Sequence, residues 1–111
     1  MQTSVAECAS AYTAEVQPNK EVERDAVKSI LNAIKQKAPG KSVELRIPPY
    51  AAIQIIEGTN HRRGTPAAVV EMNAKTLVLL AIGKISWKQA TEDGLVSASG
   101  ERSNLSDHFP V

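Results

Sequence analysis

Residues 67–100 carry the densest structural signals in the chain: AAVVEMNAKTLVLLAIGKISWKQATEDGLVSASG. An apolar, β-branched run at residues 67–72 predicts a strand. Asn73 is a good N-cap for a helix over residues 74–82, and Gly83 stands where a left-handed C-terminal residue belongs. This half of the segment therefore predicts a strand that runs directly into a helix.

The second half of the segment has the same signals for the start and the end of a helix. Ser86 and Gln89 form a capping box, in which each side chain bonds the other's backbone N–H, and this predicts a helix over residues 87–93. Gly94 ends that helix as a second left-handed residue. Residues 95–99 alternate between apolar and small polar side chains, which is typical of a half-buried strand.

Upstream, the spacing of apolar residues changes at Pro39-Gly40 from helical to alternating. Before this point, Asn19 caps a predicted amphipathic helix over residues 21–38. Acidic residues, Glu23 among them, stand in its first turns, where the helix dipole favours them, and the charged side chains of the helix lie opposite its apolar stripe. After it, residues 43–47 alternate as a strand, and the isoleucine-rich residues 51–57 form another.

A thin apolar stripe predicts one further short helix within residues 1–16, with Ser4 and Glu7 as its capping box. The whole chain then reads helices, three strands, two helices and one strand. Bunched strands are typical of the α+β class, with a mainly antiparallel sheet and helices gathered on one face.

Length and composition are those of one small globular domain. The 111 residues are 42% hydrophobic and 23% charged, with a net charge of +1. The weak charge disfavours nucleic acid as a partner. The longest apolar run, residues 77–82, is far shorter than a membrane span, and the first residues lack the pattern of an export signal. A single cysteine, Cys8, fits a reducing compartment, so we expect a cytoplasmic protein without integral membrane contact.

Several blocks of the sequence occur in the order and spacing found in sterol carrier proteins. The strand, two helices and strand of residues 67–100 resemble the C-terminal half of that family. Four further blocks resemble its bacterial subgroup, the bacterial sterol carrier-like proteins: APGKSVE at residues 38–44, IPPY at 47–50, HRRGTP at 61–66 and the ending through Asn104-Leu105-Ser106.

This resemblance implies a two-layer fold with four to five strands over residues 19–111. It does not cover residues 1–18, which we expect to form a helical arm from their own pattern. It also implies non-catalytic binding or carriage of an apolar ligand of the lipid or acyl type. Similar domains are fused to the catalytic domain of mycothiol-dependent maleylpyruvate isomerases, where they help to form the active-site cleft. The alternative is therefore an accessory domain that docks on a partner enzyme.

The helix predicted at residues 74–82 is apolar on every side, so something must cover the face that the sheet leaves open. The candidates are a lipid-like ligand, the N-terminal helix or a second subunit. If a ligand lies there, we expect it beside Leu77, Leu80, Ala81 and Trp87. Plain packing of these four side chains is the alternative interpretation.

The segment between the second and third predicted strands is longer than an ordinary hairpin loop. His61, Arg62 and Arg63 place positive charge at its tip, and arginine suits carboxylate or phosphate. These three residues are candidates for recognition of an anion or of a partner protein. A solvated surface loop is the other interpretation.

Catalytic machinery is not evident in the sequence. Cys8 has no basic neighbour in sequence to activate it, and His108 lies in the tail beside Asp107. No phosphate loop, metal-ligand spacing or nucleophile elbow occurs. We therefore expect no enzyme activity, no cofactor and no metal, with a lipid-like ligand and a protein partner or second copy as the candidate partners.

Overall fold

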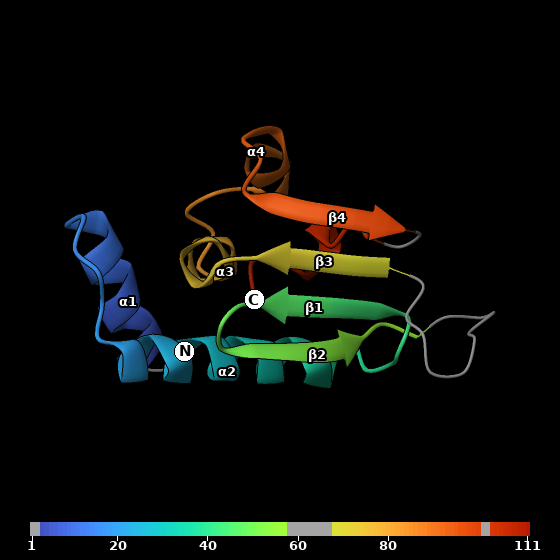
Figure 1. The fold of residues 1–111 in the computed structure, drawn as a ribbon, viewed down its shortest axis with the longest axis horizontal. Coiled ribbons are helices and arrows are strands. Elements are labelled where there is room, and N and C mark those ends of the chain that lie inside the picture. The colour runs from blue at the N-terminus through green and yellow to red at the C-terminus, as the bar shows by residue number, and fades with distance from the viewer. Residues whose placement is uncertain (1–2, 58–67, 101–102) are drawn as a thin grey trace.

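The structure, a computed structural model, describes residues 3–57, 68–100 and 103–111. Its helices and strands follow the predicted order (Figure 1). They are α1 (Thr3–Thr13), α2 (Lys20–Lys37), β1 (Val43–Ile47), β2 (Ala51–Ile55), β3 (Ala68–Met72), α3 (Ala74–Ala81), α4 (Trp87–Glu92), β4 (Val96–Gly100) and a 3-10 turn, η1 (Ser106–His108).

The four strands form one mixed sheet in the order β2-β1-β3-β4. The outer pairs, β1 with β2 and β3 with β4, are antiparallel, and the central pair, β1 with β3, is parallel. In the central pair, Val43 lies opposite Ala68 and Arg46 opposite Glu71. The α+β class with a mainly antiparallel sheet is confirmed, and the described sheet has four strands.

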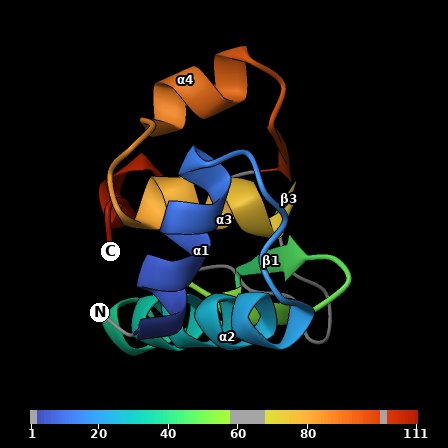
Figure 2. The ribbon, with the colours of Figure 1, turned by 90° about the vertical axis from the view of Figure 1, so that its left-hand side faces the viewer.

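The two faces of the sheet have opposite characters. Along β1, Val43, Leu45 and Ile47 are fully buried, and the residues between them point to the outer face. There Arg46 lies 3.5 Å from Glu44 and 3.8 Å from Glu71, in exposed ion pairs. Figure 2 shows α1, α3 and α4 to one side of the strands, with α2 running below them. The side chains that alternate to the buried face of β1 therefore belong to the face that packs on the helices.

Helix α3 lies in the middle of the helical layer, and α1 and α2 both pack against it. The N-terminal helix is thus one of the covers that the all-round apolar surface of α3 requires. It contributes Val5, Cys8 and Tyr12 to the core. Of the apolar side chains on α3, only Leu79 is left half-buried, and Ile82 beyond the helix end is 37% exposed.

The predicted caps are present at three helices. Asn19 Oδ1 accepts from the Glu21 N–H at 2.8 Å, Asn73 Oδ1 from the Thr76 N–H at 2.9 Å, and Ser86 Oγ from the Gln89 N–H at 3.0 Å. Gly83 and Gly94 have φ values of +79° and +73°, so α3 and α4 are each followed by a glycine in the left-handed conformation that glycine favours.

Two local predictions are wrong. Helix α1 begins at Thr3, so Ser4 lies inside it, and within the described residues its buried hydroxyl has no hydrogen-bond partner. Strand β2 ends at Ile55 rather than at residue 57, because Ile56 adopts a φ of +65° and leaves the extended conformation. Ile56 instead turns back to the end of α2, where its N–H donates to the Ala38 carbonyl at 2.7 Å.

None of the helices in the described ranges has both the length and the apolar character of a membrane span.

Candidate functional site

The four residues predicted to bind an apolar ligand lie together in the core of the helical layer. Leu77 and Leu80 are 0% exposed, Ala81 is 1% exposed and Trp87 is 9% exposed. The first three lie on α3, and Trp87 is the first residue of α4. Their apolar side chains are enclosed by protein, so a ligand could reach them only if a covering segment moves.

The C-terminal residues 103–111 supply part of that cover. In both views of the ribbon this segment lies on the helical side of the sheet, and in Figure 1 η1 is seen behind β3 and β4. The Phe109 ring stacks on Trp87 with a centroid distance of 6.1 Å and an interplanar angle of 8°. The Val111 N–H donates to the Ala81 carbonyl at 2.9 Å, and Leu105 is fully buried.

We call this arrangement the tail cover: residues 103–111 seated on Ala81 and Trp87. Its regular structure is limited to the three residues of η1, and its anchors are the Phe109 ring, the buried Leu105 side chain and the Val111 hydrogen bond. Two of the four predicted ligand-binding residues are thus direct contacts of the tail cover. Helices α1 and α2 cover α3 as well, so the tail cover is one of three segments that enclose these residues.

The second predicted cluster, His61, Arg62 and Arg63, lies outside the described residues. Recognition of an anion or a partner by these side chains stays a prediction from the sequence.

A buried polar cluster at the opposite end of α3 was not predicted. Glu23, in the first turn of α2, is only 6% exposed. The Tyr12 hydroxyl donates to its Oε2 at 2.5 Å, the Tyr50 hydroxyl to its Oε1 at 2.6 Å, and the Gln17 amide to Oε1 at 3.3 Å. One carboxylate thus joins α1, α2 and the turn between β1 and β2.

The position of Glu23 on the helical wheel was the signal that could have found this cluster. Glu23 falls on the same stripe as Val27, Ile30 and Ile34, at the spacing of one buried face. Its acidic character in the first turns favoured a solvent-facing position, and that prediction is wrong. A charged group is tolerated inside a protein when hydrogen bonds replace its hydration, and three donors supply those hydrogen bonds to the Glu23 carboxylate.

The cluster raises the pKa values of the groups around it. Burial, together with the hydrogen bond to Glu23, raises the pKa of Tyr12. The hydrogen bond to Glu23 raises the pKa of Tyr50 to about 12. Burial raises the pKa of the Cys8 thiol, and the negative charge of Glu23 adds to that effect. Both phenols and the thiol therefore stay protonated near neutral pH, which suits hydrogen-bond donors better than nucleophiles.

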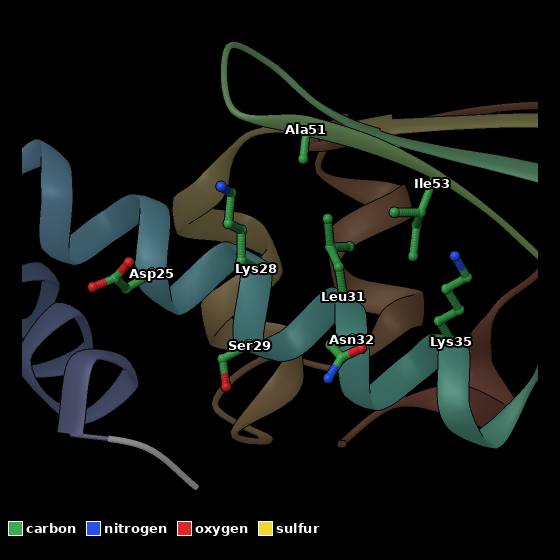
Figure 3. Close-up of a pocket in the computed structure, with 8 residues that line it drawn as sticks. All are labelled: Asp25, Lys28, Ser29, Leu31, Asn32, Lys35, Ala51 and Ile53. Atoms are coloured by element: carbon green, nitrogen blue, oxygen red, sulfur yellow. The ribbon is translucent and has the colours of Figure 1, made fainter.

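The surface formed by the described residues includes two hollows. One, of about 450 Å³, adjoins the Glu23 cluster between the end of α1, the β1–β2 turn and the start of α3. The other, of about 580 Å³, lies between α2 and the edge strand β2 (Figure 3). Neither hollow is lined by Leu77, Leu80, Ala81 or Trp87.

Residues 19–111 match the model of a protein family described as bacterial SCP ortholog, where SCP denotes sterol carrier protein. The chain belongs to the bacterial SCP ortholog family. The matched range includes Glu23, Tyr50, all four predicted ligand-binding residues and the tail cover, whereas α1 with Tyr12 precedes it.

Among solved structures, this chain is similar to the sterol carrier protein-2 like-3 of Aedes aegypti. The two sequences are 17% identical, and the match covers 74% of this chain and 92% of the mosquito protein with a TM-score of 0.43. No curated protein matches this chain.

Proposed function

We propose that the chain binds an apolar ligand of the lipid or acyl type without changing it chemically, beside Leu77, Leu80, Ala81 and Trp87. The observation that carries the proposal is the tail cover, a largely irregular segment anchored by one ring stack on Trp87, one hydrogen bond to Ala81 and the buried Leu105 side chain. Membership in a family of sterol carrier protein orthologs supports the class of ligand.

The energies of the tail contacts set the size of ligand that could replace them. An aromatic pair contributes about 0.5–1.5 kcal/mol, a hydrogen bond about as much, and a buried leucine such as Leu105 about 1.5–3 kcal/mol. Each methylene group buried by a ligand contributes about 0.8 kcal/mol. A chain of about eight or more methylene groups therefore offsets the loss of the tail cover, whereas a four-carbon acid does not.

Trp87, the chain's single tryptophan, makes this proposal directly testable. Its stack on Phe109 means that its fluorescence reports the position of the tail. We expect palmitate, added to purified protein below its critical micelle concentration, to change Trp87 emission in a saturable manner, and butyrate to leave it unchanged. Native mass spectrometry should show palmitate bound at one copy per chain.

Phe109→Ala is the informative variant, because it removes the ring that stacks on Trp87 and leaves the four ligand-binding residues themselves unchanged in sequence. Loss of about 1 kcal/mol of stacking should tighten palmitate binding about fivefold. Val16→Ala is the matched control, since Val16 is 59% exposed and lies before the family match. Absence of saturable binding by both fluorescence and mass spectrometry would overturn the proposal.

The alternative, an accessory domain that docks on a partner enzyme through His61, Arg62 and Arg63, rests on residues outside the described part of the chain and stays a prediction. Alanine at Arg62 or Arg63 should weaken such docking and leave palmitate binding unchanged.

A further inference from the structure

The groove between α2 and β2 lies where the sheet ends and the helical layer continues. The strand order places β2 at the edge of the sheet, and α2 runs beside it (Figure 1). Within the described residues, the outer edge of β2 pairs with no strand. The backbone N–H and C=O groups on that edge are therefore open to an added strand.

The floor of the groove is a part of the apolar core that is incompletely covered. Ala51 and Ile53 of β2 lie opposite Ile47 and Leu45 of β1, which are both fully buried. Ala51 and Ile53 are only half-buried, although they belong to the same face of the sheet. With Leu31 of α2 they line a hollow of about 580 Å³. This hollow has the place and the apolar floor that a fifth strand would cover.

Two lysines stand on either side of this floor. In Figure 3, Lys28 and Lys35 rise from α2 toward β2, with Leu31 between them. Seven residues along a helix place their Cα atoms about 10.5 Å apart. In the part of the chain that the structure describes, neither lysine lies within 4 Å of a carboxylate. Asp25 lies at one end of the groove, so its lining carries a net positive charge.

We propose that this groove binds an extended acidic peptide of a partner protein, which adds to β2 as a fifth strand. One apolar side chain of the peptide packs on Leu31 and Ile53. Acidic side chains two residues before and two residues after it face Lys28 and Lys35. These two positions are about 13 Å apart in an extended chain and lie on the same side as the apolar residue, so the flexible lysines can reach both.

Charge selects this occupant over two others. The chain's own residues 58–67 carry His61, Arg62 and Arg63, which have the wrong sign for a groove lined by two lysines. A second copy of β2 would present AAIQI, which has no acidic residue to pair with them. An acidic strand from another protein supplies both the backbone pairing and the counter-charges.

The experiment compares two synthetic peptides of identical composition. The peptide TEVIVET places both glutamates on the same side as its central isoleucine, whereas TVEIEVT places them on the opposite side. Binding of fluorescein-labelled peptide to the full chain is measured by fluorescence anisotropy. We expect TEVIVET to bind at least about tenfold more tightly and to weaken as salt is raised from 50 to 500 mM.

Charge-reversed variants then locate the site. Lys28→Glu and Lys35→Glu should each weaken TEVIVET about tenfold or more, because like charges replace opposite ones. Lys88→Glu, at an exposed position on α4, should change the affinity less than about twofold. In ¹⁵N-labelled protein, the amide shifts caused by TEVIVET should centre on residues 51–55.

Four outcomes would overturn the proposal. They are failure of TEVIVET to bind at millimolar concentration, equal binding of the two peptides, insensitivity to both lysine reversals, and amide shifts centred on α3 and the tail rather than on β2. Circular dichroism of each variant establishes that the reversals leave the fold intact.

Discussion

Tyr12→Phe removes one hydroxyl from the Glu23 cluster and leaves the rest of the side chain in place. Tyr12 is 8% exposed and Glu23 is 6% exposed, so the variant leaves a largely buried carboxylate short of one donor. A hydrogen bond to a charged group contributes about 1.5–3 kcal/mol. We therefore expect the free energy of unfolding to fall by about 2 kcal/mol, and the melting temperature by about 8–12 °C for a domain of this size.

Urea unfolding followed by circular dichroism measures this change, with an unaltered slope as evidence that compactness is preserved. Tyr50→Phe is the matched control, because Tyr50 is only half-buried and solvent can replace its hydroxyl. Its loss should be about 1 kcal/mol or less. The double variant should lose more than the two single losses combined, because the same buried carboxylate then keeps only the Gln17 amide.

A Glu23→Gln background tests the cause. There the partner is neutral, so Tyr12→Phe should remove only about 0.5–1.5 kcal/mol. A loss below about 0.5 kcal/mol in the parent chain, or an equal loss in both backgrounds, would refute the assignment of a charge-assisted bond.

Three further predictions concern packing, backbone and titration. Leu80→Lys should unfold the domain because Leu80 is fully buried, whereas Leu79→Lys on the half-buried side should lower the free energy of unfolding less. Thermal melting with light scattering distinguishes the two variants, and unchanged stability for Leu80→Lys would contradict the packing. Gly40→Ala should destabilise the domain far more than Gly94→Ala, whose expected loss in urea titrations is roughly 1 kcal/mol. A Cβ at Gly40 would meet the backbone of Ile56 and Glu57 just after β2, whereas one at Gly94 would meet nothing within 4 Å. The raised pKa of Tyr50, about 12 against 10, contributes stability that is present below pH 10 and lost as the pH rises toward 12; ultraviolet titration of tyrosinate should show a component near 12 that disappears in Tyr50→Phe.

The sequence predicted those parts of the fold that depend on local signals. Asn19, Asn73 and Ser86 each cap the predicted helix, since capping requires only a side chain two or three residues from the N–H that it accepts from. The class of sheet followed from the order of strands, but the parallel pairing of β1 with β3 is a long-range contact that no short pattern encodes.

The candidate sites were predicted less completely, because their members come together only in three dimensions. The apolar character of α3 indicated that Leu77 and Leu80 are covered, but the contribution of the tail was hidden by the polar residues around Leu105. The Glu23 cluster joins residues from α1, α2 and the turn after β1. The division into an arm at residues 1–18 and a domain at 19–111 stays a prediction.

The parallel pairing at the centre of the sheet has a consequence for synthesis of the chain. A ribosome releases α2, β1 and β2 before β3 exists, and the antiparallel hairpin can close at once across its short turn. Until β3 arrives, the other edge of β1 is open along Val43, Leu45 and Ile47, which are apolar and fully buried in the finished fold. The nascent chain therefore exposes the unpaired edge of β1 at mid-length. Pairing of that edge with β3 removes it as a site of intermolecular strand pairing and aggregation.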